Sequence, residues 1–146
     1  MANQKIKSVL LELLKEGRST EVHAKGISMY PLLRPNDKLL VTPTKAKVGD
    51  IAVFDRKDVL VAHRVYKIIE DIYFLKGDSL IFEDQPIPQD KILGIVTERS
   101  RNGKSVNTKS IRFKILKIIM PHCTFVLGRP FNYYARLHQK FGRCFK

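Results

Sequence analysis

The sequence has no tryptophan, and only two of its 146 residues are cysteines. Cys123 and Cys144 both lie late in the chain, without the paired spacing of a zinc site and without further cysteines that could build a disulfide framework. We interpret both as ordinary reduced thiols. The sequence therefore predicts no metal site and no cofactor.

A long apolar run is also missing. Charges begin at Lys5 near the N-terminus, and the most apolar later window, residues 115–127, is interrupted by Lys117, Pro121 and His122. Crossing the hydrocarbon core of a bilayer takes about 20 consecutive apolar residues. We expect neither a secretory signal nor a membrane span, which favours a cytoplasmic protein.

Acidic residues are absent after Glu98. Residues 1–98 hold 15 of the 27 basic residues and all 14 acidic ones, so the other 12 basic residues fall in residues 99–146 without a single acid. A split of this kind indicates a basic segment that meets an anionic partner. Charge alone leaves membrane lipid, nucleic acid and acidic peptide open as that partner.

The basic C-terminal segment, residues 110–146, also carries phenylalanine and tyrosine residues between its positive charges. This composition favours peripheral contact with an anionic membrane at its inner face over contact with nucleic acid, because aromatic rings settle at the headgroup level. The alternative is a basic helix that packs on the domain with a solvated face. Residues 111–120 fit a helix and a strand equally well, and Pro121 ends either element.

The rest of the chain reads as one mainly β domain. Apolar residues between Ile6 and Leu14 recur at helical spacing, and Gly17 is a plausible stop for that helix. After Glu21, short apolar runs alternate with turn residues, which is typical of a compact antiparallel β domain. The predicted strands are residues 38–42, 50–54, 59–69, 73–76 and 92–98, and Asn102-Gly103 predicts a hairpin tip or surface connection. We expect a domain at 1–109, including the N-terminal helix, and an extension at 110–146.

Four short stretches bear on function: residues 26–32, 48–50 and 61–65, and residues 76–78 followed by Asp84. They contain Gly-Ile-Ser-Met-Tyr-Pro-Leu, Val-Gly-Asp, Val-Ala-His-Arg-Val and Lys-Gly-Asp. In this order the stretches resemble the catalytic core of the signal peptidase I superfamily, most closely its histidine-type branch. The resemblance covers roughly residues 22–97 and implies a serine peptidase with the catalytic-core fold of that superfamily.

The resemblance implies a catalytic role for three residues. Ser28 is the expected nucleophile, His63 the general base, and Asp84 the carboxylate that orients the imidazole. Histidine suits this task because its ordinary pKa of about 6.5 lets it accept and return a proton near neutrality. Asp78 is the rival for the orienting role, and the residues alone leave the choice open. Arg64 is expected on the opposite strand face as a solvated charge.

The resemblance also assigns supporting residues. The backbone N–H of Ser28 is the natural oxyanion donor, while Gly26 stands where many relatives have a serine that supplies a second donor. Asn36 replaces a glycine of the relatives and tolerates the left-handed conformation. The apolar side chains after the serine either line a substrate groove or fill the core: Met29, Tyr30 and Leu32, with Leu33 beside them.

The leading hypothesis is a serine endopeptidase that cleaves leader or signal segments from peptides or proteins. The absence of an anchor departs from typical signal peptidases and favours processing in the cytoplasm or at the inner membrane face. A self-cleaving regulator of the phage-repressor kind is an alternative, but that group uses lysine where this chain has His63. The other alternative is a non-catalytic binding module whose basic tail contacts membrane or nucleic acid.

Overall fold

A computed structural model describes residues 2–56 and 59–108 of the chain, with the side chains of 2–7 excepted. It also describes six separate residues of the C-terminal segment, which lie in helical conformation. The predicted boundary at residue 109 and the properties expected of residues 110–146 lie outside the described residues, and the boundary and those properties stay predictions. The six residues are Ile119, Pro130, Tyr133, Tyr134, Arg136 and Leu137.

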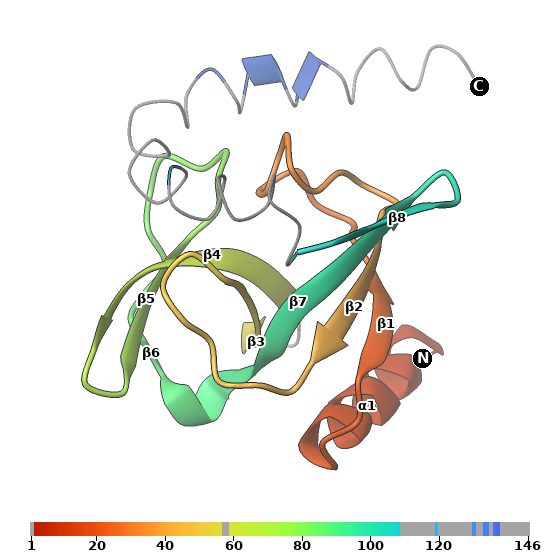
Figure 1. Cartoon of the computed structure of the whole chain (residues 1–146), viewed down its shortest axis with the longest axis vertical. Helices are drawn as coiled ribbons and strands as arrows, with labels where there is room; N and C mark the ends of the chain where they lie inside the picture. Colours follow the sequence, from red (N-terminus) through yellow and green to blue (C-terminus); the bar gives the residue numbers. More distant parts are fainter. Residues whose placement is uncertain are drawn as a thin grey trace.

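One N-terminal helix precedes a single antiparallel sheet (Figure 1). The sheet order is β1-β2-β7-β3-β4-β5-β6, and β8 pairs with β7 off this path. The mainly β prediction is therefore confirmed. The elements are α1 (Ala2–Lys15), β1 (Thr20–His23), β2 (Lys38–Thr42), β3 (Ile51–Arg56), β4 (Val59–Ile69), β5 (Ile72–Lys76), β6 (Ile87–Pro88), the 3-10 helix η1 (Gln89–Lys91), β7 (Ile92–Arg101) and β8 (Lys104–Asn107).

The core lies on both faces of β3. Ile51 and Val53 belong to one buried cluster, which also takes Leu14 of α1, while Ala52 and Phe54 belong to a second cluster with Val65, Tyr73 and Leu75. Successive side chains of a strand point to opposite faces, so a strand buried on both faces must be apolar at every position. This explains the uninterrupted apolar run at the start of β3.

The predicted strands agree with the observed ones, and two of them, residues 38–42 and 59–69, agree to the residue. Three short strands were not predicted: β1, β6 and β8, the last of which lies in the polar stretch interpreted as a hairpin tip or surface connection. Thr20–His23 is too brief to show a clear alternation, and Ile87–Pro88 has only two residues and ends in proline.

Residues with positive φ occupy the turns that the sequence predicted. Gly17 follows α1 with φ of 80°, and Asn36 has φ of 72° in the turn before β2. Asn102 and Gly103 have φ of 50° and 76° at the tip of the β7–β8 hairpin. Both central residues of such a two-residue turn need the left-handed region, which asparagine and glycine enter at low cost.

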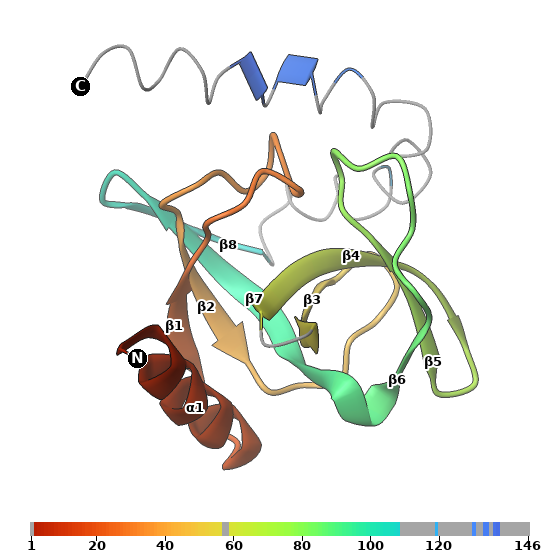
Figure 2. The same cartoon turned by 180° about the vertical axis from the view of Figure 1, so that it is seen from behind.

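Two long loops rise from the same end of the sheet, residues 24–37 in orange and residues 77–86 in green (Figure 1). The view from behind shows the same arrangement, with α1 and η1 at the opposite end (Figure 2). The stretches that the sequence singled out gather around these loops. Within the described part of the chain, no helix has the length and apolar character needed to cross a membrane.

Candidate active site

Ser28 lies at the start of a tight turn in the 24–37 loop. Tyr30 N–H donates to the Ile27 carbonyl at 3.0 Å, and Leu33 N–H donates to the Met29 carbonyl at 2.9 Å. The peptide bond between Tyr30 and Pro31 is cis. Ser28 itself is only partly buried. The turn thus fixes the backbone around a serine that stays partly exposed.

The Ser28 segment is fixed to the residues that follow β5. Ser79 N–H donates to the Ser28 carbonyl at 2.9 Å, and the Ser79 hydroxyl donates to the Ile27 carbonyl at 2.6 Å. A Cβ atom added at Gly77 would lie 2.7 Å from the Ser28 carbonyl oxygen, closer than such atoms approach. Glycine at position 77 therefore allows the nucleophile's backbone to pack directly on this segment.

His63 lies in β4, beside the same segment. His63 is paired with Ala52 of β3. On the other side of β4, the next residue, Arg64, is paired with Lys76 of β5. Continuing that antiparallel register by one residue places Gly77 opposite His63. Gly77 also abuts the Ser28 backbone, so the segment that carries Ser28 packs at the end of the β4–β5 pairing, next to the residues that flank His63. The His63 side chain is almost fully buried, and its ring meets the Phe54 ring edge to face at 6.0 Å.

Asp84 is the carboxylate in contact with His63. Its Oδ2 lies 2.5 Å from His63 Nδ1, and its backbone N–H donates to the Leu75 carbonyl at 3.0 Å. The second bond brings the 77–86 loop back against β5, so the strand that pairs with β4 also fixes the partner of His63. Nδ1 is engaged with the carboxylate, which leaves Nε2 as the ring nitrogen available for proton transfer.

Burial lowers the pKa of His63 from its ordinary 6.5 to about 3, and the positive charge of Arg56 acts in the same direction. Arg56 also pairs with Asp84 through the carboxylate oxygen that does not face the ring. Asp84 works against this shift because a carboxylate beside Nδ1 stabilises the imidazolium. The imidazole is therefore neutral at neutral pH, the form that a general base requires.

Asp78 is engaged elsewhere, with Arg64. The two side chains form a bidentate pair with distances of 2.8 and 2.7 Å, and Arg64 Nη1 donates to the Gly49 carbonyl at 2.8 Å. The expectation that Arg64 is a solvated charge was wrong, since the residue is only 3% exposed. Leu60 and Ala62, on the same face of β4 as Arg64, pack against the first core cluster, so this face is covered as well. The Arg64 guanidinium thus joins the two Gly-Asp stretches.

Lys76 is a buried residue to which the sequence reasoning gave no role of its own. It is 1% exposed, and burial lowers the pKa of its ammonium group, while the charges of Asp78 and Glu83 act in the opposite direction. A signal was available, because Lys76 directly precedes the second Gly-Asp pair. Its burial places a third ionisable side chain beside the Arg64–Asp78 pair.

The other residues predicted for the site separate into core and surface. Met29 and Leu32 belong to the buried core cluster, as does Leu33, so these side chains do not line an open groove. Tyr30 is only partly buried and remains a candidate for contact with substrate. Gly26 is exposed, and a Cβ atom there would have no neighbour closer than 4.0 Å.

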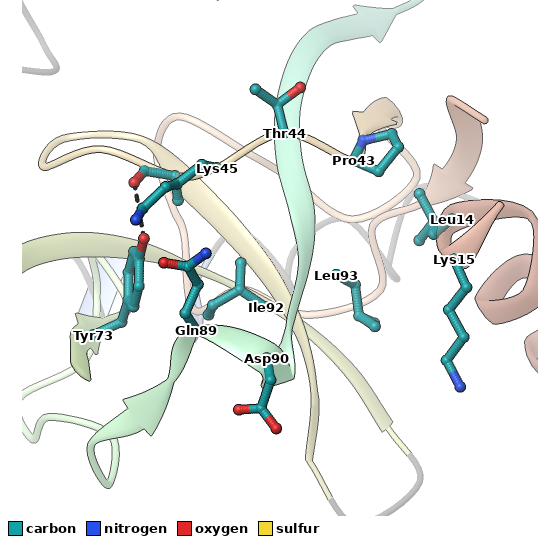
Figure 3. A pocket seen from close by; sticks show the side chains of 11 residues that line it. Leu14, Lys15, Pro43, Thr44, Lys45, Tyr73, Gln89, Asp90, Ile92 and Leu93 are labelled. Carbon is teal, nitrogen blue, oxygen red and sulfur yellow. Dashed lines mark hydrogen bonds between the residues drawn. The ribbon is translucent and has the colours of Figure 1, made fainter. Parts of the chain in front are cut away.

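A cavity of about 310 Å³ lies away from these residues (Figure 3). Leu14 of α1, Asp90 of η1 and Tyr73 of β5 contribute to its lining, which places it toward the end of the sheet opposite the 24–37 loop. The cavity therefore plays no part in the chemistry of Ser28 and His63. Across residues 2–56 and 59–108, no three His, Cys, Asp or Glu side chains gather as metal ligands.

The family described as Peptidase S24-like matches residues 4–97, nearly two thirds of the chain. The match runs from α1 into β7 and includes the Ser28 turn, His63 and Asp84. A search of curated proteins finds no match to the chain.

Proposed function

The chain belongs to the Peptidase S24-like family, and we propose that it is an endopeptidase that removes leader or signal segments from peptides or proteins. Membership of the family makes the domain a serine-type peptidase domain. The observation that supports the catalytic mechanism is the contact of Asp84 with the buried His63, beside the segment that packs on the Ser28 backbone. The proposed substrate class rests on the ordered stretches at residues 26–32, 48–50, 61–65 and 76–84.

In the proposed reaction the Ser28 hydroxyl attacks the carbonyl carbon of the scissile bond. His63 Nε2 accepts the hydroxyl proton as the new C–O bond forms, and Asp84 stabilises the resulting imidazolium through Nδ1. The tetrahedral intermediate collapses when the C–N bond breaks and the imidazolium gives its proton to the leaving amine. Water then hydrolyses the acyl-enzyme, again with His63 as the base.

The developing oxyanion needs donors that are already in position. The backbone N–H of Ser28 is one candidate, because the turn and the two bonds from Ser79 fix this part of the backbone. Gly26 contributes no hydroxyl, so a serine side chain two residues before the nucleophile cannot be the second donor in this chain.

The histidine at position 63 supports the histidine-type branch over enzymes that use lysine as the base. Location is part of the proposal: we place the activity in the cytoplasm, with peripheral contact at the inner membrane face through the basic C-terminal segment. The support for this is the composition of residues 99–146, which hold 12 basic residues and no acid.

The test is cleavage of a leader-bearing substrate by the full chain and by Ser28→Ala and His63→Ala. Each substitution is expected to lower kcat/KM by at least about 10³-fold, the scale seen when one member of a catalytic triad is removed. Circular dichroism checks that both variants fold.

Ser19→Ala and His23→Ala are matched controls, because both residues lie outside the site, in or just before β1. Full activity of either site variant would overturn the mechanism. Labelling of Ser28 by an acylating serine probe separates the enzyme from a non-catalytic binding module.

A self-cleaving regulator is the second candidate, favoured by the match to the S24-like family as a whole. In that case the wild-type chain incubated alone would give shorter fragments at a rate that does not depend on protein concentration. The Ser28→Ala chain would stay intact. Turnover of an added substrate without self-processing favours the endopeptidase.

A further inference from the structure

Three arginines gather around one aspartate where the 24–37 loop meets β7. Arg99 and Arg101 lie two residues apart in β7, so their side chains share one face of that strand. Arg34 lies in the turn itself, six residues after Ser28. The aspartate is Asp37, which is 2% exposed and directly precedes β2.

Asp37 is already bound to Arg101 and to the backbone of the turn. Arg101 forms a bidentate pair with it, with both distances at 2.6 Å, and the Arg34 backbone N–H donates to Oδ2 at 2.8 Å. Arg99 Nη1 and Arg101 Nη2 both donate to the Leu32 carbonyl, at 2.9 and 3.2 Å. These bonds fix the turn to β7 and place one carboxylate among three guanidinium groups.

The Arg34 guanidinium is the group of this cluster that the 24–37 loop itself contributes. It lies over the Tyr30 ring, 5.4 Å from the ring centre. Its Nε is buried and has no hydrogen-bond partner among the residues that the structure describes. Arg34 as a whole is only partly buried, and a guanidinium carries further N–H donors that an anionic acceptor can pair with.

The cluster carries a net positive charge. Burial lowers the pKa of Arg99, and repulsion from Arg101 and Arg34 adds to this effect, whereas Asp37 opposes it. Asp58 is the one acidic residue among those that the structure does not describe. Residues 99–146 contain no acidic residue that could neutralise the cluster. An excess of positive charge therefore lies beside the turn that carries the nucleophile.

We propose that Arg34, supported by Arg99, forms a subsite for a carboxylate side chain of the substrate peptide, next to the bond that Ser28 attacks. The inference rests on the proposed function for its substrate class. Guanidinium groups bind carboxylates through paired N–H donors, and Tyr30 holds the Arg34 group in place by stacking. The same donors would bind inorganic phosphate, so the test must separate a free anion from a peptide side chain.

The test uses the full chain with Ser28→Ala, which binds without cleaving, and fluorescent peptides that carry Glu or Gln at one position around an Ala-rich core. Fluorescence anisotropy is expected to show one position at which Glu binds about tenfold tighter than Gln, the scale of a charged hydrogen bond at a partly exposed site. Arg34→Gln in the Ser28→Ala background is expected to remove that preference while the Gln peptide binds as before.

Arg18→Gln is the matched control, because it removes the same charge from an exposed residue just after α1. It is expected to keep the Glu preference. Equal binding of Glu and Gln peptides at every position, or a preference that survives Arg34→Gln, would overturn the subsite. Binding of inorganic phosphate that depends on Arg34, without any Glu preference, would also overturn it and identify a site for a free anion instead.

Cleavage is measured separately with the wild-type chain. If peptides bind with the Glu preference but are never cleaved, the subsite stands and the proposed peptidase function fails. If peptides are cleaved with no Glu preference in either binding or kcat/KM, the function stands and the subsite fails.

Discussion

The two ends of the sheet bury different chemistry. At the loop end, side chains that carry or can take up a charge are buried beside the Ser28 turn: Asp37, His63, Arg64, Lys76 and Asp78. At the cavity end, the buried residues Ala46 and Tyr73 belong to an apolar cluster, and the Tyr73 hydroxyl donates to the Ala46 carbonyl at 3.3 Å.

The difference shows where the stability of the fold depends on ion pairs and hydrogen bonds between specific side chains. Apolar burial at the cavity end stabilises the fold without needing exact partners. At the loop end each buried charge is tolerated only because a partner and hydrogen bonds accompany it. The loop end should therefore be sensitive to single substitutions that the cavity end tolerates.

The largest expected effect comes from Arg64→Met. The substitution leaves Asp78 buried without its bidentate partner, which typically costs about 3–5 kcal/mol of the free energy of unfolding. Lys45→Met at the cavity end breaks the exposed pair of Lys45 with Asp71 and should cost less than about 1 kcal/mol. Urea denaturation monitored by circular dichroism measures both. Similar losses in the two variants would remove the contrast between the ends.

The next effect concerns the two glycines near Ser28. In Gly77→Ala the new Cβ would clash with the Ser28 carbonyl oxygen and must displace the nucleophile's backbone. A displacement of about 1 Å can lower kcat/KM by about 100-fold. Gly26→Ala meets open space and is expected to leave kcat/KM and stability close to wild type. Leader-peptide cleavage tests the pair, and unchanged activity of a folded Gly77→Ala would refute the close packing.

The smallest effect is a pH dependence of stability. The pKa of His63 is about 3 in the folded chain and near 6.5 when unfolded, so the unfolded state takes up a proton first as the pH falls. This uptake should lower the free energy of unfolding by about 2 kcal/mol between pH 7 and pH 5. His63→Asn lacks the titrating group. Its urea denaturation at the two pH values should therefore show a correspondingly smaller loss, and equal losses in both proteins would contradict the shift.

The sequence predicted the strands well where a regular pattern of apolar residues extends over many positions. The β4 run of residues 59–69 shows its boundaries in its apolar residues and turns, and Asn102-Gly103 identifies the β7–β8 turn by backbone chemistry. The alternation of β4 also separated residues 63 and 64 onto two faces. It could not reveal that both faces are covered, because the cover over Arg64 comes from residues distant in the sequence.

The choice between the two aspartates was likewise beyond the sequence. Asp78 and Asp84 follow β5 within one loop, and both lie close enough along the chain to reach His63. The outcome depends on the bond of the Asp84 backbone to Leu75 and on the bidentate pairing of Asp78 with Arg64. Neither long-range contact leaves a local pattern in the residues.

The 77–86 loop is attached at both of its bases, through Ser79 to the Ser28 carbonyl and through Asp84 to the Leu75 carbonyl. Between these attachments, Ile81 and Phe82 lie exposed at the apex, with Phe82 at 82%. The apex can therefore be lengthened, shortened or exchanged for another sequence without moving either base. It is a natural place to graft a new peptide preference onto an unchanged scaffold.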